Sequence, residues 1–276
     1  MVKSSLLKKI ALYFFAAVFL AFTTVPYIMI VILGFLPESD IIKRPPIPFK
    51  VPELTLSNYI YILSYEPFTK GFLYSAITAL ATVSLVLLVG SMGAYAVARM
   101  RFRGRGMLFN AMVIIYMLPA LAMLIPIIVL LKVFGLLDTL LGMILAHCIL
   151  LLPMMTWFMV GIYEGVPADI DAAVQIEGYS RWEALFKTNM PLCRLGVFLV
   201  LVFSFVLSWS DLMFANTVGV TKVRLLQPTI LEFMGAGRIL YGQMAAAGTL
   251  SSLPVVVLAI VLQKQIIAGI MKGAIK

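Results

Sequence analysis

Long apolar runs alternate with short polar segments along the whole chain. The apolar runs lie near 10–36, 70–98, 107–132, 139–163, 195–218 and 249–270. Each is close to the roughly 20 apolar residues that a helix needs to cross a bilayer, and far longer than a barrel strand. In hydrocarbon only a helix or a closed barrel satisfies its own backbone polar groups. The pattern therefore predicts an all-α, polytopic membrane protein with about six transmembrane helices.

Composition and charge support the same class. Of the 276 residues, 63% are hydrophobic and 12% are charged, whereas an ordinary soluble domain has about 25% charged residues. The net charge of +9 comes from lysines and arginines in short segments beside the apolar runs. Because these cations do not share one basic face, they indicate topology, with lipid and not nucleic acid as the surrounding partner.

The distribution of basic residues predicts the orientation. An even number of spans puts both termini on one side, and that side receives the larger share of lysines and arginines, including the cluster Arg99–Arg105. The positive-inside rule then places both termini in the cytoplasm of a protein of the plasma, or inner, membrane. The proline-rich segment 37–69 and the segment 219–248, with "GAG" and "YGQ" as turn signals, become outer loops. The first run is too long for a signal peptide and is expected to remain as a span.

The connection at about 164–194 differs from the rest of the chain because charged and amide side chains are concentrated in it. Pro167 and Asp171 suit the first turn of a helix, and Gly178 would end that helix. A second helix would begin at Ser180, with Glu183 three residues later completing a capping box, and would stop before Pro191. The segment thus predicts a helix, a glycine turn and a second helix on the cytoplasmic side.

An apolar stripe on the first of these helices suggests a protein partner. Ala172, Ala173 and Ile176 recur at helical spacing and would suit a groove on another protein. Two other interpretations remain open: a helical pair resting on lipid headgroups, or a long loop folded against the chain's own spans. The segment has few net basic residues for a lipid-facing helix, which favours the partner.

The run "DAAVQIEGYSRWEALFKTNMP" resembles the cytoplasmic motif of ABC-importer permeases, Glu-Ala-Ala, three residues, Gly, nine residues, Ile-x-Leu-Pro. In that family this loop is a coupling helix that docks on the nucleotide-binding subunit. The glutamate column falls on Ala172, with an acid one position earlier, and Thr188 replaces the isoleucine. The resemblance implies ATPase-coupling roles for Asp171, Ala172, Ala173, Ile176, Gly178 and Pro191.

Further blocks resemble the carbohydrate branch of these permeases, near the maltose-type subunits: "AYAVARMRFRGRG", "GLLDTLLGMILAH", "MAAAGTLSSLP" and "LQKQIIAGIMKGAIK". Their order and spacing extend the resemblance over nearly the whole chain. It implies a type I importer-like permease fold and one transmembrane permease domain over residues 1–276. The implied partners are a second permease subunit, two ATP-binding subunits and an extracytoplasmic solute-binding protein.

The chain lacks a Gly-x-x-x-x-Gly-Lys-Ser/Thr loop to bind nucleotide phosphates. We therefore expect a permease subunit that is not an enzyme, with no catalytic residue, no metal site and no cofactor of its own. ATP and Mg²⁺ would be bound by the partner subunits. Their energy would drive spans that alternate between inward and outward access, and Pro119 and Pro126 are expected to kink the third span.

Polar and aromatic residues inside the spans are the candidates for the substrate pathway. Asp211 is an acid inside an apolar run, Ser208 lies on the same helical face, and Trp209 could stack against a sugar ring. Tyr116, before Pro119, is a further candidate. His147 is expected to be a packing residue near the midplane.

The solute leaves more than one hypothesis open. The resemblance implies a sugar or oligosaccharide, while a related permease could import another polar solute such as glycerol phosphate. A stand-alone secondary carrier would need ionisable residues facing one another near the midplane and an internal repeat, and we detect neither. A membrane enzyme would need clustered catalytic side chains, which the sequence does not show.

Overall fold

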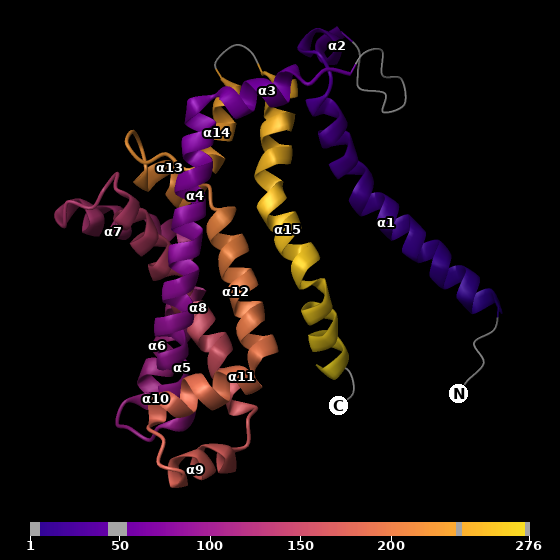
Figure 1. Ribbon diagram of the computed structural model, residues 1–276. Coiled ribbons are helices and arrows are strands. Elements are labelled where there is room, and N and C mark those ends of the chain that lie inside the picture. The colour runs from indigo at the N-terminus through magenta and orange to yellow at the C-terminus, as the bar shows by residue number, and fades with distance from the viewer. Residues whose placement is uncertain (1–5, 44–53, 236–238, 274–276) are drawn as a thin grey trace. The chain divides into compact units, whose positions relative to one another are not determined.

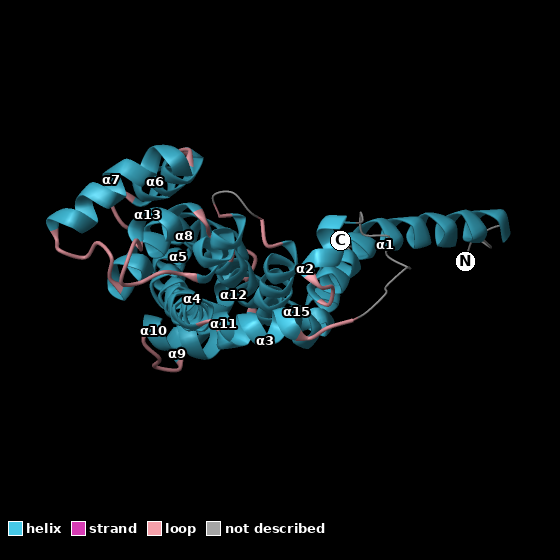
Figure 2. Cartoon of the chain, turned by 90° about the horizontal axis from the view of Figure 1, so that it is seen from above, coloured by secondary structure: helices cyan, strands magenta, loops and turns pink. Residues whose placement is uncertain are grey.

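The computed structural model describes residues 6–43, 54–235 and 239–273, and every regular element in these ranges is a helix (Figure 2). Internal contacts divide the chain into two compact units. The first takes in residues 1–69 and 229–253, and the second takes in residues 70–228 and 254–276. This confirms the all-α prediction, while the single permease domain over residues 1–276 stays a prediction. Arg238 and residues 44–53 of the predicted outer loops lie outside the described residues.

The first unit contains four short or long helices and the beginning of a fifth: α1 (Leu6–Gly34), α2 (Glu38–Lys43), α3 (Ser57–Ser64), η3 (Glu232–Met234) and α15 (Tyr241–Gly273). The carboxylate of Glu38 accepts hydrogen bonds from the amides of Tyr241 (3.0 Å) and Gly242 (2.9 Å). An anion at this position satisfies amides that the first turn of α15 leaves unpaired. The last span therefore begins at Tyr241 and not near 249, and "YGQ" is helical instead of a turn.

The side chain of Asn58 holds the end of α1 in the same unit. Its amide nitrogen donates to the carbonyl oxygens of Gly34 (3.1 Å) and Leu36 (2.9 Å), and the Tyr59 hydroxyl donates to Val31 (3.1 Å). These are carbonyls that the last turn of a helix cannot pair internally. Most side chains from Lys8 to Ile28 are exposed among the described residues, which leaves this part of α1 for lipid or a partner.

The second unit contains most of the remaining helices: α4 (Glu66–Leu85), η1 (Val86–Gly90), α5 (Ser91–Arg99), α6 (Arg105–Met117), α7 (Ala120–Val133), α8 (Leu140–Glu164), α9 (Ala168–Ile176), α10 (Arg181–Glu183), η2 (Ala184–Asn189), α11 (Met190–Leu192), α12 (Arg194–Trp209), α13 (Met213–Val218) and α14 (Leu226–Leu231). Helix α8 is central, because α5, α6, α7, α12 and α13 all contact it (Figure 1). Met143, Met155 and Met159 on α8 are fully buried or nearly so. The flexible methionine side chain fills irregular gaps between helices.

Two of the six predicted spans are interrupted. The third is split at Leu118–Pro119 into α6 and α7, which are bent by 104°; a residue before proline disfavours helical backbone and proline lacks an amide hydrogen. The fifth ends at Trp209, and α13 is a separate short helix. Among the described residues four helices are long and apolar enough to cross a membrane, or up to six if each bent pair is one span. The prediction of about six spans holds in this broader sense.

Asp138 fixes the connection between α7 and α8. Its carboxylate accepts hydrogen bonds from the amides of Val220, Thr221, Lys222 and Val223, and from the Thr221 hydroxyl. Its own amide donates to the carbonyl oxygen of Val218 (3.0 Å). The loop after α13 thus wraps around one carboxylate. The backbone of Asp138 itself is left-handed (φ 59°).

The charge state of Asp138 follows from these contacts. Partial burial of the carboxyl raises its pKa, but the hydrogen bonds from the Thr221 hydroxyl and from the surrounding amides outweigh burial and hold the pKa well below its usual range. The ionised form therefore stabilises this loop.

We predict that Asp138→Asn loosens the loop at residues 220–223. Because hydrogen bonds to a charged acceptor contribute roughly 1.5–3 kcal/mol, and less when partly exposed, amide exchange there should accelerate about tenfold. Hydrogen-exchange mass spectrometry on the purified protein measures this. In the wild type the stabilisation is present above the ordinary aspartate pKa of about 3.9 and is lost as the pH falls below it. Equal exchange in both proteins would contradict the role of Asp138.

Candidate functional site

The polar segment 164–194 folds largely as the sequence predicts. Helix α9 follows Pro167 and ends before Gly178, whose left-handed backbone (φ 89°) suits glycine. The Gly178 amide donates to Gln175 (3.0 Å) and closes the helix end. Ser180 then starts the next helix, because its hydroxyl accepts from the Glu183 amide (3.3 Å) while the Glu183 carboxylate accepts from the Ser180 amide (3.0 Å). The predicted glycine turn and capping box are confirmed.

The second helix of the segment does not stop before Pro191. The chain continues through the π-helical turn η2 into α11, which ends at Leu192. Pro191 is the second residue of α11, directly after the π-helical turn. The sequence argument treated proline as a terminator and did not anticipate the wider π-helical turn that precedes it.

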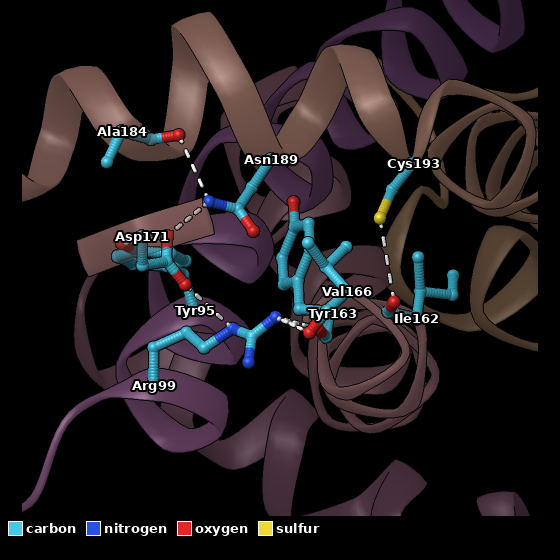
Figure 3. A network of polar contacts seen from close by, with 9 residues as sticks. All are labelled: Tyr95, Arg99, Ile162, Tyr163, Val166, Asp171, Ala184, Asn189 and Cys193. Carbon is cyan, nitrogen blue, oxygen red and sulfur yellow. Dashed lines mark hydrogen bonds and ion pairs between the residues drawn. The ribbon is translucent and has the colours of Figure 1, made fainter. Parts of the chain in front are cut away.

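Asp171 is the centre of a buried polar network (Figure 3). Its side chain projects from α9 toward the protein interior, and the residue is 7% exposed. One carboxylate oxygen lies 3.0 Å from Nε of Arg99 at the end of α5. The other accepts hydrogen bonds from the Tyr95 hydroxyl (3.1 Å) and from the side-chain amide of Asn189 on η2 (2.6 Å). Three separate helices are thereby joined through one carboxylate.

Arg99 links this carboxylate to the end of α8. Its guanidinium donates to the carbonyl oxygens of Tyr163 (2.7 Å) and Val166. The last carbonyls of a helix have no partner within it and attract a cation. The planar guanidinium has enough donors to serve the carboxylate and both carbonyls at once. Arg99 is therefore the point where α5, α8 and α9 meet.

Two further contacts fix the helix that follows. The Asn189 amide also donates to the carbonyl oxygen of Ala184 (3.2 Å), and the Cys193 thiol lies 3.5 Å from the Ile162 carbonyl oxygen (Figure 3). Ala184 itself is fully buried. The segment is thus attached to the spans at both of its ends.

The opposite face of α9 is exposed. Ala172 and Ala173 lie at the surface, and Ile176 is 87% exposed. The following turn and helix also carry exposed aromatic side chains: Tyr179, Trp182 and Phe186. We call this set the docking surface. The six residues assigned to ATPase coupling therefore divide, with Asp171, Gly178 and Pro191 shaping the segment and the other three displayed at its surface.

Sequence reasoning missed Tyr95, Arg99 and Asn189 as members of the network. The available signal was an arginine at the end of an apolar span and an acid in the next predicted cytoplasmic connection. Their separation along the chain gives no indication that they meet. Only the packing of α5 against α8 brings them within reach.

The pathway candidates fall in two places. Ser208 lies 2.7 Å from Nδ1 of His147, and Asp211 lies 3.4 Å from Nε2 of the same ring. Asp211 also accepts from the Ala215 amide (2.9 Å), so it caps α13. His147 is 1% exposed, as a packing residue would be. This cluster joins α8 to the end of α12.

The two aromatic candidates differ in exposure. Trp209 is 3% exposed and packs against Phe72 and Phe205, with ring centroids 5.2 Å and 5.6 Å apart. Tyr116 lies elsewhere, 47% exposed at the end of α6, and stacks on Trp157 at 6.4 Å. Substrate contact by Tyr116, Ser208, Trp209 and Asp211 stays a prediction.

Comparison with known proteins identifies the family. Residues 87–272 match the model of the family described as binding-protein-dependent transport system inner membrane component. The chain belongs to this family. It is accordingly a membrane permease component of a transporter.

Curated relatives of this family member span almost its full length. It is 28% identical to the trehalose transport system permease protein of Mycobacterium tuberculosis, covering 92% of this chain and 93% of the relative. It is 26% identical to the trehalose/maltose transport system permease protein of Thermococcus litoralis, covering 99% of both. The diacetylchitobiose uptake system permease protein NgcG of Streptomyces coelicolor is also 26% identical, over 91% of this chain and 84% of the relative.

A solved structure confirms the fold of the permease. A bacterial ABC transporter involved in the import of the acidic polysaccharide alginate contains a chain that superposes with a TM-score of 0.80. The match covers 96% of this chain and 98% of that chain at 17% sequence identity. The predicted ABC-importer permease fold is confirmed.

We predict that Arg99→Met destabilises the protein by about 3–5 kcal/mol, because it leaves the buried Asp171 carboxylate without its cation. The double variant Arg99→Met/Asp171→Leu should lose less than the sum of the single variants, since no unpaired charge remains. Thermal unfolding in detergent measures both. The exposed pair of Arg105 and Glu164, 3.4 Å apart, gives the control, where Arg105→Met should cost about 1 kcal/mol or less. Additive losses at Arg99 and Asp171 would refute the coupling between them.

Proposed function

We propose that this permease is the transmembrane subunit through which an ATP-driven importer moves a sugar or oligosaccharide. It forms the translocation pathway with a second permease and receives the solute from an extracytoplasmic binding protein. Two ATP-binding subunits bind ATP and Mg²⁺ and supply the energy. The named solutes of the relatives, trehalose, maltose and diacetylchitobiose, support the sugar class.

The arrangement of the 164–194 segment supports coupling to an ATP-binding subunit. One face of α9 is anchored by the buried Asp171 network, while the other displays Ile176 with 87% of its surface exposed. An isoleucine in water at the tip of a helix gains roughly 1.5–3 kcal/mol when a groove buries it. A short amphipathic helix presented in this way fits the helix-in-groove mode of recognition.

The distribution of basic residues supports a cytoplasmic position for this docking surface. With both termini in the cytoplasm, the connection between α8 and α12 faces the compartment that supplies ATP. When the ATP-binding subunits close, they displace α9. The contacts of Arg99 with Asp171, Tyr163 and Val166 pass that displacement to α5 and α8, and the spans change between inward and outward access.

We predict that Ile176→Asp weakens binding of the ATP-binding subunit at least about tenfold, because the apolar contact is replaced by a charge that must lose its water. Binding-protein-stimulated ATPase activity of the assembled complex should fall with it. Thermal stability of the isolated permease should not change, since the side chain is exposed. Affinity measurements in detergent and ATPase assays in proteoliposomes measure the two effects.

Phe102→Asp is the matched control. Phe102 is a 41% exposed apolar residue in a different predicted cytoplasmic connection, so the same apolar-to-acid change there should leave ATPase coupling intact. Normal coupling in Ile176→Asp would overturn the docking role of α9. Import of glycerol phosphate but none of a panel of disaccharides would overturn the sugar class and retain the importer.

A further inference from the structure

Helices α6 and α8 line an open aromatic pocket that none of the sequence motifs indicates. Its volume is about 350 Å³, and its lining residues are Phe109, Trp157, Phe158, Val160, Gly161 and Glu164. Small-molecule sites typically have roughly 300–1,000 Å³ and apolar or aromatic walls with a few polar groups. The pocket therefore has the size and lining of a site for a small organic solute.

Tyr116 of α6 adjoins this pocket through its contact with Trp157. Its ring stacks on that of Trp157 on α8, with centroids 6.4 Å apart and planes inclined by 18°. The ring centroid of Phe158, also on α8, lies 5.1 Å from that of Trp157. Phe109 and Tyr116 share one face of α6, because seven residues make about two helical turns. The aromatic side chains therefore form one continuous surface, of which Tyr116 is 47% exposed.

Distances along the two helices indicate that the surface lies at membrane depth. Trp157 precedes the end of α8 at Glu164 by seven residues, or roughly 10 Å, and Tyr116 follows the start of α6 at Arg105 by eleven, or roughly 16 Å. Arg105 and Glu164 are 3.4 Å apart, so these two helix ends are level. The stack thus lies well inside a hydrocarbon core of about 30 Å, away from the headgroup level of aromatic belts.

Two polar groups on this surface require a polar neighbour. Within the described residues, nothing pairs with the Tyr116 hydroxyl or with the Trp157 indole N–H. Acyl chains could not satisfy either group, and an unpaired polar group in hydrocarbon is costly. The break at Leu118–Pro119 is two residues from Tyr116, and irregular backbone at this depth occurs where it is buried in protein or lines a water-filled cavity. Discontinuous helices form the solute sites of other transporters.

We propose that Tyr116 and Trp157 form a stacking platform for one ring of the sugar inside the translocation pathway. One face of a pyranose ring is rich in C–H bonds and packs on an aromatic ring, while its hydroxyl oxygens accept hydrogen bonds from the indole N–H and the tyrosine hydroxyl. Phe109 and Phe158 form the walls, and Glu164 lies at the cytoplasmic mouth. This assignment rests on the proposed import of a sugar.

Gly161 offers a direct test, because a Cβ there would meet no atom within 4 Å. The Gly161→Cys permease is assembled with its partner subunits in inverted vesicles and treated with a charged, water-soluble methanethiosulfonate. The new thiol should react with the reagent. If maltose or trehalose is the transported sugar, that sugar at ten times its dissociation constant should slow the reaction about tenfold. The wild type, with Cys148 and Cys193, gives the background. Leu20→Cys on the exposed helix α1 gives a thiol in an apolar environment, which should not react.

Substitutions of Trp157 separate sugar contact from a structural role. Trp157→Leu should lower the sugar imported per ATP hydrolysed about tenfold, while assembly and stimulated ATPase activity persist. Trp157→Phe keeps an aromatic face and should recover most of the import. Phe203→Leu, a 57% exposed aromatic on α12, is the matched control and should import normally.

The outcomes distinguish the platform from the proposed function. Absence of reaction at Gly161→Cys would show a groove covered by lipid or by the second permease and would overturn the platform. Reaction without protection by a sugar that the wild type imports would overturn it as well. A wild-type complex that imports no disaccharide would instead overturn the sugar class of the proposed function, and the sugar platform with it.

Discussion

The contact between Asp171 and Arg99 is the constraint on which the arrangement of the polar segment depends. A buried ion pair is tolerated only when good geometry and further hydrogen bonds satisfy the groups that have left water. Here the carboxylate also accepts from Tyr95 and Asn189, and the guanidinium also donates to the end of α8. Because these partners come from α5, α8 and η2, the network attaches α9 to all three elements. The network thereby fixes which side of α9 is exposed.

Other acids act in the same way at other junctions. Glu38 accepts from the first amides of α15, and Asp138 accepts from consecutive amides of the loop after α13. In each case a carboxylate satisfies backbone amides that a helix end or a turn leaves unpaired. A chain with only twelve acids thus uses several of them to connect segments that are distant in sequence. Apolar packing between spans cannot specify these connections, because lipid tails are as apolar as the side chains.

The interruption of spans has a structural consequence. The break between α6 and α7 at Pro119 and the end of α12 at Trp209 place irregular backbone next to polar or aromatic side chains. At the first break these are Tyr116 and Trp157, and at the second they are Ser208, Asp211 and His147. Continuous helices would expose only side chains to a solute, whereas broken ones also offer backbone groups.

The sequence by itself determined the membrane class, the approximate positions of the apolar spans and the local form of the 164–194 segment. These depend on hydrophobic run length and on residues within four positions of each other, such as Ser180 with Glu183, so they are visible in the chain. Only the tertiary structure decided that Asp171 points inward to Arg99 instead of outward, that Trp209 is enclosed, and that Trp157 shares a pocket with Phe109. These outcomes depend on which helices pack together, and separation along the chain carries no information about the distance between side chains on different helices.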